Sequence, residues 1–433
     1  MSIKVAIIGS GPSGFYTADS LLKSGHDVEI DIIERLLTPF GLIRGGVAPD
    51  HQTTKKVARA YEKTALNEAV AYFGNVEVGK DVTMEELRET YDAVVLAVGA
   101  PTDRKLGIPG GDKEGVFGSA DFVGWYNGHP DFTDLKPDLN VGAVAVVGVG
   151  NVAIDIARVL VKTPAEMAAT DIADHAAEAV QASPLTDVYM FGRRGPVEAK
   201  FTNVELREMG KLENCMPIVH ADQLPDAVTG DWSDRDQRLK ERNLATMREF
   251  LDVDPAGKQK NCHFEFFANP VEVLGGDRVE GLRVERTKVE GGRAVGTGEF
   301  FDVECGLVVA AIGYYSIPIE GVPFDADNGI VVHDDGRVGD GVYAVGWIKR
   351  GPTGVIGTNK PDGETAAQQI LEDVSEGTKP GRDALQAMLG ERGVRVVNYN
   401  DWQKIEQAEI AAASGEAPRR KFVTVPEMLA VLN

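Results

Sequence analysis

Three glycines near the beginning of the chain have the spacing of a phosphate-binding turn. Gly9, Gly11 and Gly14 fit the pattern G-x-G-x-x-G, between an apolar run at 5–8 and a helical pattern of apolar residues that begins at Phe15. The first glycine of such a turn permits a tight bend, the second lets the backbone approach a pyrophosphate, and the third lets helix and strand pack closely. The N-terminus of the helix adds free N–H groups and a partial positive charge, so a nucleotide phosphate could bind here.

A carboxylate follows at the distance from which it could bind a ribose. Glu34 ends a second apolar run, 28–33, and lies 20 residues after Gly14. From this position a carboxylate can accept hydrogen bonds from the ribose hydroxyls of a dinucleotide. A glycine-rich turn alone is common and is often only structural. Because strand, turn, helix, strand and acid occur here in order, the sequence predicts a dinucleotide site.

A second turn of the same kind lies near the middle of the chain. Gly148, Gly150 and Ala153 fit G-x-G-x-x-A, an allowed form of the same pattern, directly after the apolar run 144–147. Apolar residues then continue at helical spacing as far as Leu160. The sequence therefore predicts a second dinucleotide site.

The next apolar run indicates which dinucleotide the second site would prefer. Residues 188–191 are followed by Gly192, Arg193 and Arg194, where a site for NAD would carry an acid. Two arginines suit a 2′-phosphate instead, although they could also be solvated loop charges. Two dinucleotide sites, the second favouring NADP, are typical of a flavoprotein that holds FAD in the first site and NADPH in the second.

Two further apolar runs indicate how the chain is organised. Residues 92–99 and 306–313 both end in Ala-x-Gly, one before and one after the second turn. They are similar to the segments that link the domains of two-dinucleotide flavoproteins. The expected fold class is α/β, with two doubly wound Rossmann-like domains and the NADP domain inserted into the FAD domain. The expected boundaries are 1–101 and 312–433 for the FAD domain and 102–311 for the NADP domain.

Composition excludes several other functions. The chain has 433 residues, 45 Lys and Arg against 67 Asp and Glu, and a net charge of −22, which argues against binding to nucleic acid or to an anionic membrane. Its three cysteines, Cys215, Cys262 and Cys305, form no C-x-x-C pair, so a dithiol redox centre and a zinc finger are both disfavoured. No run of about 18 apolar residues and no signal-peptide pattern is present, which predicts a soluble cytoplasmic protein.

Five stretches of the chain resemble the adrenodoxin-reductase-type ferredoxin–NADP reductases, especially the bacterial members. They are GLIRGGVAPDH at 41–51, DFVGWYN at 121–127, GRRGP at 192–196, ELRE at 205–208 and VGWIKRGPTGVIGTNK at 345–360. The resemblance runs from residue 3 to near the C-terminus, and the last stretch is highly specific. It implies two doubly wound domains, tightly but non-covalently bound FAD, and a monomer.

The resemblance also assigns residues to the two cofactors. Together with the glycine turns, it implies FAD contacts from Gly9, Gly11, Ser13, Gly14, Glu34, Leu42, Val78, Trp347, Gly354, Val355 and Ile356. It implies NADP contacts from Arg104, Gly148, Gly150, Asn151, Val152, Ala153, Ile154, Arg193, Arg194, Glu205 and Gly354. His51 and Glu208 match family positions near the flavin and the nicotinamide. Phe40 departs from the tryptophan that bacterial relatives have before the Gly-Leu pair.

The implied activity is a ferredoxin–NADP reductase, in which FAD takes a hydride from NADPH and passes single electrons to a ferredoxin, or the reverse. Flavin can exchange both two electrons and one, so the protein mainly supplies placement and excludes water. We therefore expect no nucleophile and no metal, and we expect His51 and Glu208 to tune nicotinamide docking and the flavin potential. The alternatives are an NADPH-dependent quinone or diaphorase-type reductase and a non-enzymatic cofactor sensor.

A ferredoxin partner raises a question of charge, because ferredoxins are usually acidic and this chain is too. Lys55, Lys56 and Arg59 follow His51 closely, and five basic residues interleaved with acids occupy the stretch 235–248. An ordinary solvated helix face would explain that stretch as well. Our hypothesis is that some of these basic residues form a positive docking surface beside the flavin.

Overall fold

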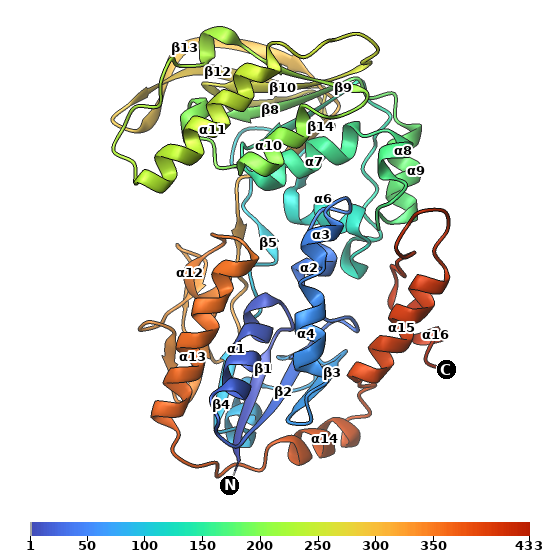
Figure 1. Ribbon diagram of the computed structural model, residues 1–433, viewed down its shortest axis with the longest axis vertical. Coiled ribbons are helices and arrows are strands. Elements are labelled where there is room, and N and C mark those ends of the chain that lie inside the picture. Colours follow the sequence, from blue (N-terminus) through green and yellow to red (C-terminus); the bar gives the residue numbers. More distant parts are fainter. Residues whose placement is uncertain (1) are drawn as a thin grey trace.

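Four strands from the first hundred residues and two strands from 337–344 form the first sheet of the computed structural model, which describes residues 2–433 (Figure 1). The strand order is β18-β19-β4-β1-β2-β3, and all neighbours are parallel except β18 and β19. The strands are β1 (Ile3–Ile8), β2 (Val28–Glu34), β3 (Val70–Gly74), β4 (Ala93–Leu96), β18 (Arg337–Gly339) and β19 (Val342–Ala344).

The first sheet is buried on both faces, which is why its central strands are almost wholly apolar. Along β1, Ile3, Val5 and Ile7 enter one core, whereas Ala6 and Ile8 enter the core on the opposite face. Helices α1 (Pro12–Lys23), α4 (Ala58–Ala65) and α13 (Asn359–Asp373) cover the first of these faces, and α5 (Met84–Thr90) and α14 (Arg382–Glu391) cover the other.

A second sheet of six parallel strands contains the second glycine turn. Its order is β6-β14-β7-β8-β10-β9. The strands are β6 (Val116–Gly118), β7 (Ala143–Val147), β8 (Asp187–Gly192), β9 (Cys215–Val219), β10 (Lys260–Phe266) and β14 (Leu307–Ala310). Along β7, Val144 and Val146 enter a core shared with helices, whereas Ala145 and Val147 enter a second core.

That second core lies against a three-stranded antiparallel sheet. It is made of β11 (Ala268–Leu274), β12 (Gly281–Glu290) and β13 (Arg293–Glu304). Strands β11 and β12 form an antiparallel hairpin around Gly275. Val273, Leu282 and Val284 fill the space between the small sheet and the large one.

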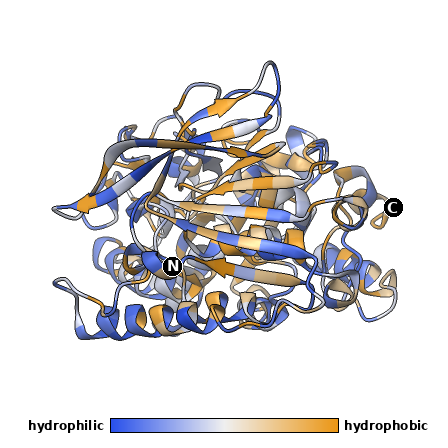
Figure 2. Ribbon diagram, turned by 90° about the horizontal axis from the view of Figure 1, so that it is seen from above, coloured by the Kyte–Doolittle hydropathy of each residue, from blue (hydrophilic) through white to orange (hydrophobic). Residues whose placement is uncertain are grey.

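Helices on the other face of the second sheet carry most of the charged residues discussed below. They are α6 (Ser119–Asn127), α7 (Asn151–Val161), α8 (Pro164–Met167), α9 (Asp174–Ala182), α10 (Asn203–Met209) and α11 (Asp234–Phe250). Helices α8 and α9 form a short helical excursion between α7 and β8. In Figure 2 hydrophobic residues follow the strands inside the molecule, and hydrophilic residues lie on the outer helix surfaces.

Two short strands join the sheets. β5 (Thr102–Asp103) and β15 (Tyr314–Tyr315) pair antiparallel, so the two connecting segments lie side by side between the halves of the molecule (Figure 1). The hydroxyl of Ser316 also donates to the carbonyl of Gly99, at 2.8 Å. No helix within residues 2–433 is long and apolar enough to cross a bilayer.

The remaining short elements lie around the first sheet. They are α2 (Leu42–Gly45), α3 (Gln52–Lys55), α12 (Trp347–Arg350), the 3₁₀ helix η4 (Ile356–Thr358) and the hairpin of β16 (Phe324–Asp325) and β17 (Ile330–Val331). The chain ends with α15 (Tyr399–Ala411) and α16 (Val425–Ala430), both beside the β3 edge of this sheet (Figure 1). Trp402, Ile405 and Met428 from these two helices are buried in its core.

Candidate functional site

The two glycine turns stand at the carboxyl ends of β1 and β7, and the same steric constraint shapes both. Gly9 has φ +105°, and a Cβ there would lie 2.5 Å from the carbonyl oxygen of Ala97. Gly148 has φ +145°, and a Cβ there would lie 2.3 Å from the carbonyl oxygen of Ala311. The Ala-x-Gly motifs therefore supply the neighbouring strand end against which each turn packs, and only glycine fits.

The middle glycine of each turn has a different surrounding. A Cβ on Gly11 or Gly150 would meet nothing within 4 Å. No protein contact therefore requires glycine at these two positions, but close approach of a phosphate to the backbone would require it. In contrast, a Cβ on Gly14 would lie 2.2 Å from the carbonyl oxygen of Gly9, because α1 packs tightly against the turn. The open space at Gly11, and likewise at Gly150, lies beside a helix N-terminus. We call this space the phosphate cradle, and it fits a bound pyrophosphate.

Glu34 lies beside the first turn with its carboxylate already oriented. Its Oε2 accepts hydrogen bonds from the backbone N–H of Ser10 at 3.0 Å and from the Ser10 hydroxyl at 2.6 Å. Its Oε1 accepts from the N–H of Leu36 at 3.0 Å. Each carboxylate oxygen can accept further bonds, so Glu34 is placed to bind a ribose next to the phosphate cradle.

Two other predicted flavin contacts adjoin the same turn. Leu42 follows Gly41, where a Cβ would lie 3.0 Å from the Cα of Gly11, and the Leu42 side chain is 47% exposed. Val78 is half-buried against the first-sheet core. Two residues before it, the backbone N–H of Val76 donates to the carbonyl of Glu34, at 3.0 Å. An exposed leucine beside a phosphate cradle is typical of a site where a ligand ring packs.

The predicted contacts from the C-terminal part return to the N-terminus of α1. Gly346 has φ +72°, and a Cβ there would lie 2.7 Å from the Ser13 hydroxyl. Next to it, the Trp347 ring stacks on Tyr314 with ring centroids 5.7 Å apart, and its indole N–H donates to the Thr353 carbonyl at 3.1 Å. Gly354 and Val355 follow in an exposed loop, and Ile356 is half-buried.

The second turn agrees less completely with the predicted contacts. Asn151 uses its Oδ1 to accept from the N–H of Thr202 at 2.7 Å, so this side chain braces the loop before α10. Val152 is half-buried, but Ala153 and Ile154 are buried in the core of the second sheet. Their side chains therefore pack into the core, and their backbone N–H groups at the start of α7 are the groups that could reach a phosphate.

Three arginines that are more distant along the chain are predicted to contact a nucleotide at the second turn. Arg193 follows β8 and is exposed. Its backbone carbonyl accepts a hydrogen bond from the Thr287 hydroxyl at 2.8 Å. Arg194 donates only a long bond of 3.4 Å, to the carbonyl of Gly292. The Arg104 guanidinium lies over the Tyr315 ring, 4.2 Å from its centroid. Within the part of the chain that the structure describes, the Arg193 guanidinium has no partner and that of Arg194 has only this long bond, so both could bind a phosphate group.

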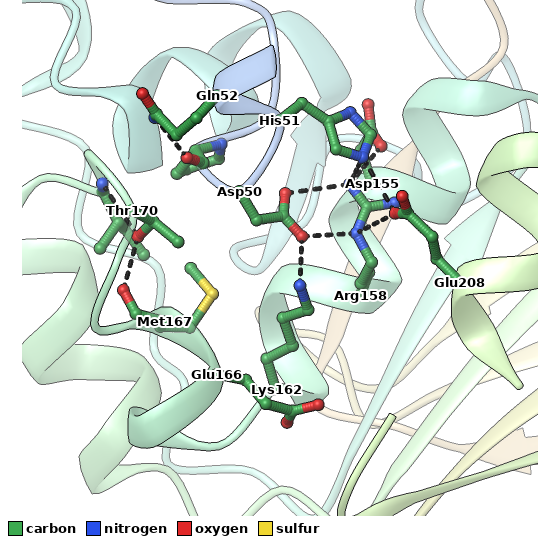
Figure 3. A network of polar contacts seen from close by, with 12 residues as sticks. Asp50, His51, Gln52, Asp155, Arg158, Lys162, Glu166, Met167, Thr170 and Glu208 are labelled. Atoms are coloured by element: carbon green, nitrogen blue, oxygen red, sulfur yellow. Dashed lines mark hydrogen bonds and ion pairs between the residues drawn. The ribbon is translucent and has the colours of Figure 1, made fainter. Parts of the chain in front are cut away.

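A charged cluster connects the two sheets between the turns (Figure 3). His51, just before α3, comes from the first sheet's part of the chain, and Glu205 and Glu208 come from α10 of the second. The His51 Nε2 lies 3.0 Å from Glu208 Oε2 and 3.2 Å from Glu205 Oε2. The resemblance predicted all three residues, and the structure brings them into contact.

Arg158 is the centre of this cluster, and the sequence did not identify it. Its side chain is fully buried on α7, and its Nη2 lies 3.0 Å from Asp50 Oδ1, 2.8 Å from Asp155 Oδ1 and 2.8 Å from His51 Nε2. Lys162 adds a second cation, 2.6 Å from Asp50. The available signal was an aspartate and an arginine three residues apart on an otherwise apolar helix, because buried charges must be paired.

The cluster shifts the pKa values of its members in opposite directions. Burial and the charge of Asp155 raise the pKa of Glu205 to about 7. Burial raises the pKa of Glu208, but the hydrogen bond from His51 and the charge of Arg158 lower it further, to a value below the ordinary one. Burial lowers the pKa of His51, but Glu208, Asp155 and Glu205 outweigh it and leave that pKa above the ordinary value. The pair therefore favours a proton on His51 facing an ionised Glu208.

Two sets of side chains in this cluster have the composition of metal ligands. Asp50, His51 and Glu208 form one set, and His51, Asp155 and Glu205 form the other. Arg158 contacts members of both sets within 3.0 Å, so a cationic group already lies among these ligand atoms. A divalent ion would have to displace a buried guanidinium, which makes the cluster a poor fit for a metal.

The basic residues considered for docking divide into buried and free groups. Lys55 does not belong to a docking surface, because its Nζ lies 2.5 Å from Asp171 and its side chain is only 11% exposed. Arg235, Arg238 and Arg242 are exposed on one face of α11 and form no ion pair or hydrogen bond within residues 2–433. Helix α11 lies beside α10, where Asn203 donates to Thr246 at 3.0 Å. We refer to these three arginines as the basic face of α11.

Phe40 places an aromatic ring directly before the Gly-Leu pair. It has φ +82° and donates its backbone N–H to the carbonyl of Ser10, at 3.0 Å. Its ring packs against Phe15 and Trp402, with centroids 5.6 and 6.1 Å away. Phe40 therefore fixes the turn that leads to Leu42.

Comparison with known proteins gives one consistent result. The family model described as pyridine nucleotide-disulphide oxidoreductase matches residues 3–189. The mitochondrial NADPH:adrenodoxin oxidoreductase of Arabidopsis thaliana is 41% identical, covering 99% of this chain and 95% of that protein. NADPH-ferredoxin reductase FprA of Mycobacterium tuberculosis is 38% identical, covering 99% and 98%. The solved structure of FprA in complex with NADPH matches 100% of this chain and 99% of that one, with a TM-score of 0.95.

Proposed function

The chain belongs to the family of NADPH:adrenodoxin and NADPH-ferredoxin reductases, and from this we propose that it transfers electrons between NADPH and a ferredoxin-type iron–sulfur protein through FAD. It is an oxidoreductase with FAD and NADP(H) as cofactors. One observation carries the proposal: His51 from the first sheet's part of the chain meets Glu205 and Glu208 from the second within 3.2 Å. Ligands on the two glycine turns would converge at this contact.

We assign FAD to the first turn. The open cradle at Gly11, the oriented carboxylate of Glu34 and the exposed Leu42 support this assignment. The proposed contacts are Gly9, Gly11, Ser13, Gly14, Glu34, Leu42, Val78, Trp347, Gly354, Val355 and Ile356. These residues lie around the first sheet, whose strands come from the first hundred residues and from 337–344. This arrangement supports an FAD domain of residues 1–101 and 312–433.

We assign NADP(H) to the second turn and place its domain at residues 102–311. The open position at Gly150 and the free guanidinium groups of Arg193 and Arg194 support a phosphorylated dinucleotide. The further proposed contacts are Arg104, Gly148, Asn151, Val152, Glu205, Gly354 and the backbone of Ala153 and Ile154.

The chain's own contribution to the chemistry is placement, charge and exclusion of water. Bound FAD supplies the exchange between a hydride and single electrons. The buried ion pair of Arg158 and Asp50 fixes the residue directly before His51, and the Nε2 of His51 holds a proton toward Glu208 Oε2. The stacked rings of Trp347 and Tyr314 add an apolar wall beside the connecting strands. Such a preformed site orients the reacting groups without reorganising at the moment of transfer.

We propose that the iron–sulfur partner docks against the basic face of α11. Free arginines on one helix face create a local positive potential on an otherwise acidic molecule, and α11 lies beside the helix that carries Glu205 and Glu208. We further propose that the protein acts as a monomer in the cytoplasm. Its three cysteines are all free and buried, as a reducing compartment permits.

The decisive experiment is NADPH-dependent reduction of cytochrome c by the FAD-loaded protein, with and without a ferredoxin from the same organism. A large ferredoxin-dependent increase is expected. Bleaching of the flavin absorbance by NADPH without any increase from ferredoxin would instead favour a quinone or diaphorase-type reductase. Absence of bleaching would contradict the assignment of both cofactors.

A further inference from the structure

We call the parts of the molecule built around the first and the second sheet its first and second halves. The segment between α15 and α16 leaves the core of the first sheet and runs along the second half. In Figure 1 it rises from the top of α15 toward α9 before the chain returns to α16. Trp402 and Ile405 precede it and Met428 follows it, and all three are buried in the first-sheet core. We call residues 412–424 the strap.

Lys421 is the point at which the strap contacts the second half. Its side chain is 1% exposed, and its Nζ lies 3.1 Å from the carbonyl of Asn127, 3.3 Å from Asn127 Oδ1 and 3.4 Å from Asp171 Oδ2. Asn127 ends α6, and Asp171 lies in the loop before α9. Neighbours of both, Tyr126 and Ile172, pack in the core of the second sheet.

The same lysine also binds the first half. Its Nζ donates to the carbonyl of Arg44 on α2, at 3.2 Å. Fully buried Glu409 on α15 pairs with the Arg44 guanidinium and accepts from the N–H of Phe422 at 2.8 Å. The backbone of the strap is therefore tied to α2 and α15 on either side of Lys421.

Asp171 joins the strap to the segment that carries His51. It binds Lys55 at 2.5 Å as well as Lys421, and Lys55 lies four residues after His51. On the other side of the strap, a Cβ on Gly128 would lie 2.6 Å from Val423, so the end of α6 fits closely against the strap. One buried network thus contacts the segment that carries His51 and also fixes how closely the second half packs against the strap.

We propose that Lys421 is a positioning residue, which holds the NADP half against the FAD half in the orientation that hydride transfer requires. The inference rests on the proposed function. A single Nζ donor bridges carbonyl and carboxylate groups from three separate segments, which no apolar side chain of the same length could do. Removing it leaves buried acceptors unpaired at the junction, and the two halves are then free to shift. Small displacements of reacting groups are sufficient to slow a transfer strongly.

The test compares Lys421→Met with Arg420→Gln in the FAD-loaded full chain. Arg420 lies on the same strap and pairs with Asp174 at 2.6 Å, but this pair is exposed, so its loss should change little. Stopped-flow reduction by saturating NADPH gives the limiting rate. Long-wavelength charge-transfer absorbance on adding NADP⁺ to the reduced protein reports stacking of nicotinamide on flavin. FAD content and the NADPH Kd report binding alone.

For Lys421→Met we expect the limiting rate to fall about 10-fold and the charge-transfer absorbance to weaken. FAD content should be unchanged and the NADPH Kd should stay within about 2-fold, because neither nucleotide turn is altered. Arg420→Gln should match the wild type in every measurement. A wild-type rate and absorbance in Lys421→Met would overturn the proposal, whereas failure of the wild type itself to be reduced by NADPH would overturn the proposed function instead.

Asp171→Asn provides a second variant in case Lys421→Met does not fold. It keeps the shape of the side chain and weakens the bond to Lys421, so the same two signals should change in the same direction by a smaller factor. Unchanged signals in a folded Asp171→Asn protein would overturn the proposal. Loss of folding in both variants would also overturn it, because these residues would then support stability in general rather than position.

Discussion

The charge of the His51 ring depends on its neighbours as well as on the imidazole itself. A lone histidine on a loop is more often structural than catalytic, but here Arg158, Glu205 and Glu208 all lie within 3.2 Å of its Nε2. The two glutamates favour the charged ring, and the buried arginine opposes it. The proton on His51 is therefore set by the balance of the cluster, which includes residues from both halves of the molecule.

We expect His51→Gln to slow flavin reduction by NADPH while leaving FAD content unchanged. Loss of one charge-assisted hydrogen bond of about 1.5 kcal/mol corresponds to roughly a 10-fold lower rate. Stopped-flow absorbance measures the rate, and the ratio of flavin to protein absorbance measures the content. His263→Gln is the matched control, since His263 pairs with Asp187 at 2.8 Å on the second sheet, away from the cluster. Flavin reduction at the wild-type rate in His51→Gln would contradict the proposed role of His51.

Glu205 should make stability depend on pH near neutrality. Its folded pKa of about 7 lies above the ordinary 4.5, so the folded protein binds the extra proton and loses stability as the pH rises through this window. Glu205→Gln removes that loss. The variant should gain about 1–2 kcal/mol relative to the wild type between pH 5 and pH 8, after allowance for solvent screening.

Thermal unfolding of both proteins across this pH range provides the measurement for Glu205. Glu86→Gln on α5 is a control of opposite sign, because the hydrogen bond from Arg392 lowers the pKa of Glu86 to about 2 and no histidine of the described chain adjoins this pair. The contribution of Glu86 to stability is lost only in acid, below the ordinary pKa, so the difference of this variant from the wild type should stay constant from pH 5 to pH 8. A constant difference for Glu205→Gln as well would refute the assignment.

At the scale of elements, each glycine turn is defined by the strand next to it. Gly9 meets the end of β4 and Gly148 the end of β14, so each half uses the same packing of turn against a neighbouring strand. The arginines after β8 then distinguish the second site from the first. Among the described residues, the side chains of Arg193 and Arg194 make one long hydrogen bond, from Arg194 to Gly292, so their charge is available to a ligand.

Replacing Arg193 and Arg194 together by glutamine should raise the KM for NADPH and leave the KM for NADH nearly unchanged. Each guanidinium–phosphate bond contributes about 1.5 kcal/mol, so the NADPH KM should rise roughly 10- to 100-fold. Steady-state diaphorase assays with the two nucleotides measure both values, and NADH serves as the internal control. Equal losses for both nucleotides would contradict the assignment of a 2′-phosphate site.

At the scale of the whole molecule, net charge and local charge have opposite signs. The chain carries −22, yet the basic face of α11 presents three exposed arginines that pair with no group among residues 2–433. Repulsion between two acidic proteins is screened beyond about 10 Å at ordinary ionic strength, so close local contacts decide the docking geometry. An acidic partner is thus compatible with an acidic enzyme.

Ferredoxin-dependent turnover should fall about 5- to 10-fold as salt rises from low to high concentration, because salt screens the attraction between the partners. Arg238→Gln should flatten this dependence without changing flavin reduction by NADPH. Lys404→Gln on α15 is the control, since Lys404 is 59% exposed and lies on another face. A salt-independent turnover would remove the electrostatic docking proposal.

Local features were the ones that the sequence could predict. Tight turns require glycine where φ is positive or where a Cβ would clash, so Gly9, Gly14 and Gly148 were recognisable from spacing alone. His51 and Glu208 were recognisable only through family resemblance. Arg158 was missed because its charge lies on an apolar helix and its partner Asp50 lies 108 residues away. For the same reason the sequence could not show that Lys55 is buried, since its partner Asp171 lies 116 residues from it.

The sequence by itself determined the two phosphate turns, their order along the chain and the preference for a phosphorylated second nucleotide, because each depends on a few consecutive residues. Only the tertiary structure decided which charges face one another across the two halves. His51 and Glu208 are 157 residues apart, and Lys421 and Asn127 are 294 apart. Buried charges must find partners wherever the fold supplies them, and that choice is made by packing rather than by neighbouring residues.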